Sequence, residues 1–229
     1  RKVKDQYGHP QQCQIWLAKN VTQRNLEVAK ILDEMCVPVM AVQSLEKEVL
    51  KNIKRGNIST ETYVEYQQKF HSLGRRTYSD LIVPLPGETL ETHIQSIRSL
   101  FDFGVDIIAC HNMRLLAGAE TNSDETRKKY DFKTRFRVIH GDVGIYSSPD
   151  GSFLKTFEFE ESLRETITMN ETDLFYLRKL HFLIDFCWNS EVYKIMLQRL
   201  KFYGINPIDL LEKLVSQHAI TDAQGQKFI

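Results

Sequence analysis

Polar side chains stand where the short apolar segments of this sequence end, and their types and spacing suit chemistry. Lys19 and Asn20 close the segment that begins at residue 13, and Gln43 and Ser44 close the segment that begins at residue 37. An amine such as that of Lys19 can form a Schiff base with a carbonyl compound. Asn20 and Ser44 are also good N-cap residues, so capping of the following helices is a structural alternative for both.

A third apolar segment, residues 79–86, runs into the turn Pro84-Leu85-Pro86-Gly87. The two prolines lack backbone N–H groups, so a regular strand cannot continue through them. Gly87 permits either a tight turn or the close approach of a ligand to the backbone. The third predicted strand therefore ends in Pro84, Leu85, Pro86 and Gly87.

The fourth segment, residues 105–112, ends in His111 and Asn112 and is followed by Met113. His111 suits either ligand binding or a structural hydrogen bond. Arg55 lies beyond the helix predicted after Ser44. Its guanidinium is suited to binding an anion through two hydrogen bonds, and the alternative is a surface arginine.

The cysteines are widely spaced along the chain, at Cys13, Cys36, Cys110 and Cys187. No pair has CxxC or other metal-ligand spacing, so we predict reduced thiols and no metal site. The aromatic segment 174–188, LFYLRKLHFLIDFCW, is predicted to pack in the core, with His181 as a packed histidine rather than a ligand.

Alternation of apolar segments and amphipathic helices positions these groups. Segments 13–20, 37–44, 79–86 and 105–112 are predicted strands, and each of the first three is followed by helical periodicity. This pattern predicts parallel βα units of a TIM-like (β/α) barrel or a doubly wound sheet. The carboxyl ends of parallel strands share one edge, so the polar groups above are expected to meet there.

The pattern changes after about residue 115. Two strands around the turn SSPDGS, residues 147–152, predict a β-hairpin, and three helices follow it, the last beginning at Asn206-Pro207. We divide the chain into residues 1–125 and an α+β extension, residues 126–229. The fold class is therefore α/β, a partial barrel followed by a hairpin and a helical region.

Composition argues against several classes of protein. Lys+Arg and Asp+Glu are equal at 30 each, so a nucleic-acid partner is not expected. No window has the roughly 18 apolar residues of a membrane span, and the first residues lack the apolar core of a signal peptide. A cytoplasmic protein without a membrane partner is the expectation.

Three stretches together resemble a known family. Residues 42–66 (VQSLEKEVLKNIKRGNISTETYVEY), 79–97 (SDLIVPLPGETLETHIQSI) and 104–120 (GVDIIACHNMRLLAGAE) resemble the second half of the radical SAM barrel, in the subgroup with an N-terminal cobalamin-binding domain. The resemblance implies an enzyme that uses S-adenosylmethionine, a [4Fe-4S] cluster and cobalamin to modify a small-molecule or natural-product substrate, commonly by C-methylation.

Carried over by position, the resemblance implies a binding site for S-adenosylmethionine. Gln43 and Ser44 would approach the ribose, and Arg55 would meet the methionyl carboxylate. The adenine would lie on the backbone of Val83, Pro84 and Leu85. His111, Asn112 and Met113 would complete the pocket, and Lys19 and Asn20 would face the reaction centre as substrate-side residues.

The sequence also departs from the family pattern. The CxxxCxxC segment that binds the cluster, the first two barrel strands and the cobalamin-binding domain are absent from these 229 residues. Pro84 replaces a usual glycine, and Gly118-Ala119-Glu120 replaces GTE. We interpret the chain as part of a longer protein, inactive alone because it lacks cluster ligands. The alternatives are another βα-barrel enzyme, a Schiff-base lyase or isomerase that uses Lys19, and a degenerate barrel without catalysis.

Overall fold

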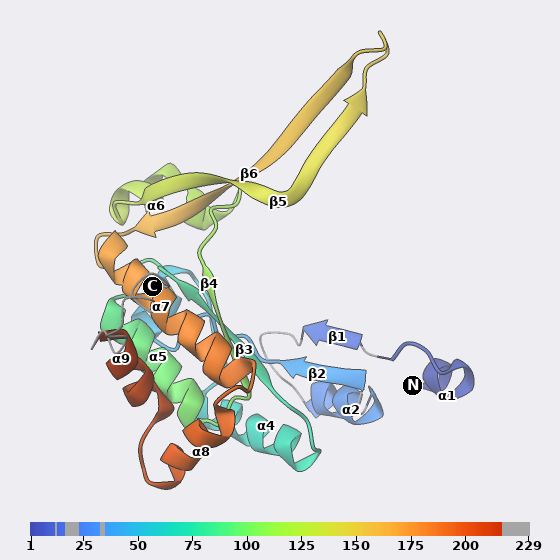
Figure 1. The fold of residues 1–229 in the computed structure, drawn as a ribbon, viewed down its shortest axis with the longest axis vertical. Coiled ribbons are helices and arrows are strands. Elements are labelled where there is room, and N and C mark those ends of the chain that lie inside the picture. Colours follow the sequence, from blue (N-terminus) through green and yellow to red (C-terminus); the bar gives the residue numbers. More distant parts are fainter. Residues whose placement is uncertain (12, 17–22, 33–34, 217–229) are drawn as a thin grey trace, which may run out of the picture.

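A four-stranded parallel sheet forms the centre of the molecule (Figure 1). The computed structural model describes residues 1–11, 13–16, 23–32 and 35–216. The strands are β1 (Cys13–Trp16), β2 (Cys36–Val39), β3 (Tyr78–Val83) and β4 (Ile107–Asn112), and they lie in sequence order. The four predicted strands and their parallel arrangement are confirmed, but two are shorter than predicted: β2 ends at Val39 rather than at residue 44, and β3 ends at Val83 rather than at residue 86, directly before the prolines.

Helices follow the first three strands, as predicted. The helices of this part are α1 (Lys2–Tyr7), α2 (Gln23–Leu32), α3 (Lys47–Asn52), α4 (Thr60–Ser72) and α5 (Leu90–Asp102). The Ser59 side chain caps α4 by accepting a hydrogen bond from Thr62 N, which satisfies one of the free N–H groups at the helix start. The α/β class with a parallel sheet is therefore confirmed, whereas membership of a TIM-like barrel stays a prediction.

The predicted β-hairpin is confirmed and extends far from the body of the molecule (Figure 1). It consists of β5 (Lys133–Ser147) and β6 (Phe153–Glu165), and it follows a 3-10 turn, η2 (Glu120–Asn122), and α6 (Asp124–Lys129). Its base is held by charge-assisted hydrogen bonds, because Arg127 Nη1 and Nη2 bind the two carboxylate oxygens of Glu161.

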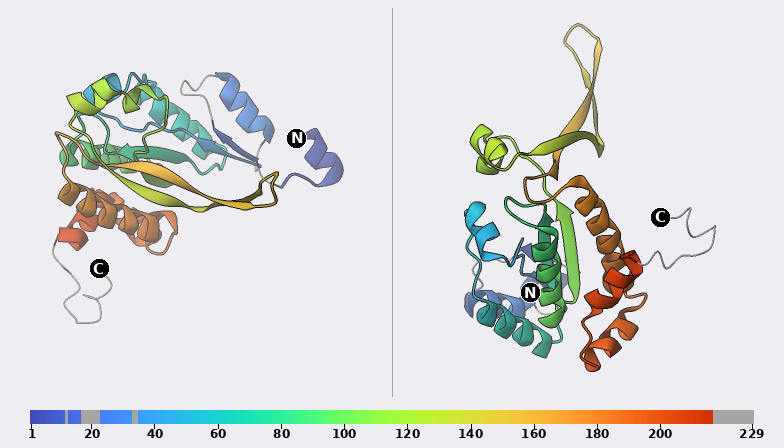
Figure 2. Two further views of the ribbon diagram at one scale, coloured as in Figure 1. Left: turned by 90° about the horizontal axis from the view of Figure 1, so that it is seen from above. Right: turned by 90° about the vertical axis from the view of Figure 1, so that its left-hand side faces the viewer.

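Three helical elements and a π-helical turn complete the described chain: α7 (Glu171–Leu183), η3 (Ile184–Asn189), α8 (Lys194–Phe202) and α9 (Pro207–Ser216). The views in Figures 1 and 2 show α7 and α9 beside α5. Leu81 of β3, Ile97 of α5 and Leu177 of α7 belong to one buried core. Residues on both sides of position 125 share this core, and the predicted division at that position stays a prediction.

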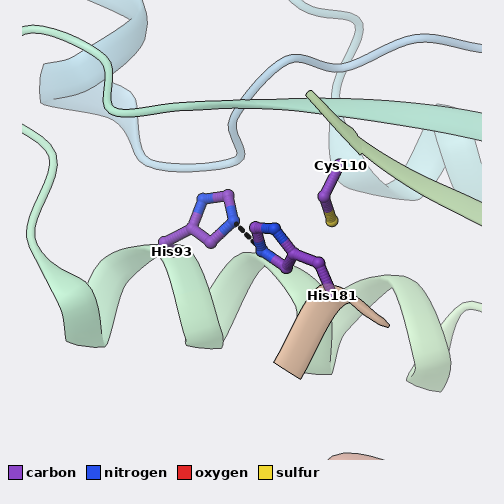
Figure 3. A group of neighbouring side chains, drawn as sticks. All are labelled: His93, Cys110 and His181. Atoms are coloured by element: carbon purple, nitrogen blue, oxygen red, sulfur yellow. Dashed lines mark hydrogen bonds between the residues drawn. The ribbon is translucent and has the colours of Figure 1, made fainter. Parts of the chain in front are cut away.

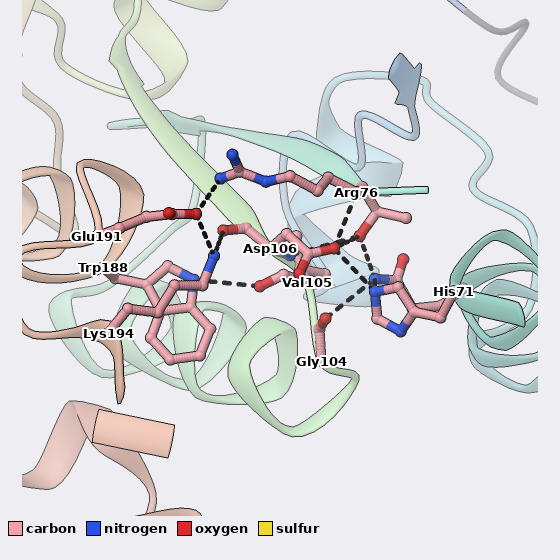
Figure 4. Close-up of polar contacts among 10 residues, drawn as sticks. His71, Arg76, Gly104, Val105, Asp106, Trp188, Glu191 and Lys194 are labelled. Carbon is pink, nitrogen blue, oxygen red and sulfur yellow. Dashed lines mark hydrogen bonds and ion pairs between the residues drawn. The ribbon is translucent and has the colours of Figure 1, made fainter. Parts of the chain in front are cut away.

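Two of the apolar residues of α8 do not pack in the core. Ile195 is 84% exposed and Met196 48% exposed, whereas Lys194 and Leu197 are buried. The Lys194 amine lies over the ring of Trp188, 5.2 Å from its centroid, and donates to the carbonyl of Asp106 (Figure 4). Packing against this ring and the start of β4 therefore selected a buried stripe one residue away from the one that apolarity suggested.

Asp106, at the entrance to β4, also joins separate elements (Figure 4). Its carboxylate accepts hydrogen bonds from His71 of α4 at 2.8 Å and from the backbone N–H of Thr77 at 2.8 Å. Trp188 Nε1 donates to the carbonyl of the neighbouring Val105 at 3.2 Å. These contacts fix the amino end of β4, opposite the end at which the candidate site lies.

Among the described helices, none has the length and apolarity needed to cross a membrane.

Candidate functional site

A cavity of about 460 Å³ opens at the carboxyl end of the sheet. It is lined by Gln43, Ile53, Arg55, Ile82, Leu85, His111, Asn112, Met113, Arg114, Leu116 and Thr121. Six of these eleven residues are among those predicted from the strand ends and the family resemblance: Gln43, Arg55, Leu85, His111, Asn112 and Met113. The structure thus brings residues from four separate segments to one pocket.

Gln43 reaches the pocket through an unusual backbone conformation. Its φ is 62°, in the left-handed region that residues with a Cβ avoid. The strand ladder holds it there, because Gln43 N donates to the carbonyl of Asp80 at 2.8 Å and Gln43 O accepts from Ile82 N at 2.9 Å. Such strain at a pocket is typical of residues positioned for binding.

Arg55 is placed by the end of α3. Arg55 N donates to Leu50 O at 2.8 Å and Lys54 N donates to Lys51 O at 3.1 Å, while Lys54 has a φ of 51°. These bonds form a Schellman motif, which reverses the chain at the end of the helix. The motif turns the half-buried Arg55 toward the end of β2.

The guanidinium of Arg55 is anchored by two hydrogen bonds. Nη2 donates to the carbonyl of Ala41 at 2.7 Å and Nε donates to Asn57 Oδ1 at 3.2 Å. Burial lowers the pKa of Arg55, and the nearby carboxylate of Asp80 opposes that shift. An arginine remains charged under these conditions, so this side of the pocket offers a fixed positive charge.

The geometry of the turn after β3 accounts for the residue types found there. Gly87 has a φ of 82°, and a Cβ at this position would lie 2.6 Å from Asn52 Nδ2, so a side chain here would be strained and would have to displace the Asn52 amide. The buried Glu88 accepts a hydrogen bond from Leu85 N at 3.2 Å. Thr89 begins α5 with a capping box shared with Thr92. Gly87, Glu88 and Thr89 therefore close the turn that holds Leu85 at the pocket.

One face of the sheet below the pocket carries ionisable groups. Tyr78, Asp80 and Ile82 alternate along β3 on the face away from the helical core, and His111 of β4 pairs with Ile82 in the register. His111 Nε2 lies 3.0 Å from Asp80 Oδ1. This hydrogen bond raises the pKa of His111, and burial opposes the rise. Burial first, and Asp80 second, raise the pKa of Tyr78.

Some predicted residues lie elsewhere. Ser44 is fully buried, and its Oγ lies 3.4 Å from Glu88 Oε1 and accepts from Glu46 N. Val83 packs in the helical core, and Pro84 is buried beside it. None of these three lines the pocket. Lys19 and Asn20 lie outside the described residues, so their predicted positions are not tested.

Asp80, Glu88 and Arg114 were missed by sequence reasoning. The alternation of SDLIV places Asp80 on the same strand face as Ile82, and this signal could have identified it. Arg114 lines the pocket and binds Glu160 of the hairpin at 3.0 Å. That contact links segments far apart in the sequence, and local spacing carries no signal for it.

Comparisons with known proteins place this α/β chain among relatives of one class. No family model matches it. It is 28% identical over 137 residues to the cobalamin-dependent radical SAM methyltransferase TokK of Streptomyces tokunonensis, a match covering 58% of this chain and 20% of that protein. It is 30% identical over 131 residues to the 2-(S-pantetheinyl)-carbapenam-3-carboxylate methyltransferase of Streptantibioticus cattleyicolor, covering 56% and 19%. The chain thus spans about a fifth of the length of these curated relatives.

Solved structures show a weaker likeness. The radical S-adenosylmethionine methyltransferase TsrM of Kitasatospora setae, with tryptophan and a SAM analogue bound, aligns at 16% identity and a TM-score of 0.44, covering 56% of this chain and 25% of that one. Coproporphyrinogen III oxidase HemN of Escherichia coli, a radical SAM enzyme, aligns at 19% identity and a TM-score of 0.46, covering 76% and 32%. Likeness at these scores does not establish a shared fold.

The sequence matches confirm the predicted resemblance. The chain is similar, over part of its length, to a cobalamin-dependent radical SAM methyltransferase and to a second curated methyltransferase.

Proposed function

We propose that this chain forms the S-adenosylmethionine-binding side of a cobalamin-dependent radical SAM enzyme that methylates carbon in a small-molecule or natural-product substrate. The supporting observation is the convergence of Gln43, Arg55, Leu85 and His111 on one pocket. These residues come from separate segments of the chain, and only the ends of parallel strands bring them together.

The pocket residues fit the chemistry of S-adenosylmethionine. The volume of the pocket, about 460 Å³, lies in the usual range for small-molecule sites. Arg55 supplies a positive charge for a carboxylate, and Gln43 supplies an amide donor and acceptor for ribose hydroxyls. Leu85 and Met113 supply apolar surface for a purine ring. The pocket thus offers groups that match the carboxylate, the ribose and the purine of S-adenosylmethionine.

The proposal does not place the iron–sulfur cluster or cobalamin on the residues of this chain. In this family the cluster and cobalamin supply radical cleavage of S-adenosylmethionine and methyl transfer. The CxxxCxxC ligands are absent from these residues, and the described cysteines are far apart in sequence. We propose that both groups are held by protein outside these 229 residues, and that this chain binds and orients S-adenosylmethionine and excludes water from it.

Calorimetric titration of the purified chain with S-adenosylmethionine tests the proposal. We expect saturable 1:1 binding, weakened roughly 10- to 100-fold by Arg55→Ala, because a charge-assisted hydrogen bond contributes about 1.5–3 kcal/mol. Arg55→Lys keeps the charge but not the two-pronged donor geometry, and we expect an intermediate loss. Arg135→Ala, which removes an exposed hairpin arginine, is the matched control and should bind normally.

Two results would contradict this assignment. One is the absence of measurable binding by a chain whose circular dichroism shows that it is folded. The other is an equal affinity of the Arg55→Ala and Arg135→Ala variants, which would mean that the ligand does not meet Arg55.

A further inference from the structure

Two histidines and a cysteine meet on the helical side of the sheet, away from the pocket. His93 lies on α5, Cys110 on β4 and His181 on α7 (Figure 3). One ligand atom from each, two imidazole nitrogens and the cysteine sulfur, lie within 4.8 Å of one another. His93 is fully buried, and Cys110 and His181 are partly buried. The three residues are 17 and 71 positions apart in the chain, and no local motif connects them.

The two imidazole rings are arranged as a metal would require. His93 Nε2 lies 3.1 Å from His181 Nε2. Two nitrogens bound tetrahedrally to zinc at about 2.0–2.1 Å lie about 3.3 Å apart, so the rings need little movement to share an ion. The same distance also fits a hydrogen bond from one ring to the other. The competing interpretation is therefore a purely structural histidine pair.

Glu88 holds His93 in the tautomer that a metal ligand needs. Glu88 Oε1 lies 3.3 Å from His93 Nδ1, and neither side chain is exposed to solvent. A carboxylate oxygen accepts, so Nδ1 carries the hydrogen and the lone pair is left on Nε2, which faces His181. A carboxylate behind the ring is the arrangement that fixes the tautomer of metal-bound histidines.

We propose that His93, Cys110 and His181 bind one Zn²⁺ ion, with water as a fourth ligand. Two imidazoles and a thiolate are a donor set that zinc accepts with an open fourth position. Binding replaces the thiol hydrogen by a sulfur–zinc bond and releases one proton to solvent. The ligand atoms already lie within 4.8 Å of one another, and nitrogen and sulfur ligands of one zinc ion are separated by roughly 3.6 Å.

A bound dication offsets the cost of a partly buried thiolate at Cys110, because a coordinating thiol is deprotonated by the ion.

The ion would join elements that are distant in sequence. It would link α5, β4 and α7, and through His93 it would hold Glu88, whose second oxygen accepts from Leu85 N at 3.2 Å. Leu85 lines the pocket. The site would thus stabilise the turn under the pocket, and this role does not depend on the proposed function.

Titration of the metal-stripped chain with Zn²⁺ and Co²⁺ tests the proposal. We expect one equivalent to bind, Co²⁺ to give the absorption of tetrahedral thiolate coordination, and Zn²⁺ at 100 times its dissociation constant to raise the melting temperature by roughly 5–10 °C. Cys110→Ser should abolish the thiolate absorption, and His181→Gln should remove the stabilisation. Glu88→Gln keeps all three ligands and should weaken binding roughly 10- to 100-fold.

Cys13→Ser is the control, because this cysteine lies on β1, outside the cluster, and the variant should bind as the parent does. Circular dichroism identifies variants that do not fold, and the Co²⁺ spectrum of the unmodified chain tests the site without any substitution. Absence of stoichiometric binding to that chain, or a thiolate spectrum that survives Cys110→Ser, would overturn the proposal. Retention of S-adenosylmethionine binding alongside either result would leave the proposed function intact.

Discussion

The left-handed backbone at Gln43 leads to a paired prediction for stability and binding. We compare Gln43→Gly with Gln43→Ala, since both remove the side-chain amide but only glycine tolerates a φ of 62° without strain. The left-handed conformation costs a residue with a Cβ about 1–2 kcal/mol. Glycine's greater loss of chain entropy on folding returns about 0.5–1 kcal/mol of that.

The net expectation is that Gln43→Gly is more stable than Gln43→Ala by roughly 0.5–1 kcal/mol. In a domain of this size that difference corresponds to a melting temperature higher by about 1–4 °C, measurable by calorimetry and by urea unfolding. Both variants should lose affinity for S-adenosylmethionine equally, by roughly 2- to 12-fold, the contribution of one hydrogen bond of about 0.5–1.5 kcal/mol.

Asp131 provides a control, because its φ is 48° and its side chain is exposed, away from the pocket. Asp131→Gly should likewise be more stable than Asp131→Ala, with unchanged ligand affinity. If the alanine variant at Gln43 proves as stable as the glycine variant, the strained backbone is refuted. If neither Gln43 variant changes affinity, the amide does not contact the ligand.

Three further predictions concern stability. Gly87→Ala should cost about 1–3 kcal/mol in urea unfolding, because φ is 82° and the new Cβ would lie 2.6 Å from a side-chain nitrogen on α3; an unchanged midpoint would contradict the turn geometry. Arg127 lowers the pKa of Glu161 below 4.5, so this carboxylate stabilises the fold above that pH and loses the effect as pH falls through its folded-state pKa. The stability gap between parent and Glu161→Gln, about 1 kcal/mol at pH 6, should therefore shrink toward pH 3, and a constant gap would refute the ion pair. Lys194→Ala should destabilise by about 1–2 kcal/mol through its lost packing and hydrogen bond, whereas Ile195→Ala, at an 84% exposed position, should stay within about 0.5 kcal/mol; the reverse order would mean that Ile195, and not Lys194, packs against the fold.

The sequence by itself determined the order and type of the main elements. Continuous apolar runs and helical periodicity identified the four parallel strands and the helices between them, because packing of strands and helices in one core imposes these patterns locally. Turn residues identified the hairpin, and Pro207 marked the start of α9. Since parallel strands end at one edge, the convergence of Gln43, Leu85 and His111 also followed from local signals.

The tertiary structure alone decided which side chains at those ends face the pocket. Ser44 and Gln43 are adjacent, yet Ser44 turns to Glu88 and the helical core while Gln43 lines the cavity. Contacts between distant segments, such as His93 with His181 and Lys194 with Trp188, depend on how α5, α7 and α8 pack on the sheet. Packing is set by the shapes of all neighbouring side chains at once, and the spacing of residues along the chain does not encode it.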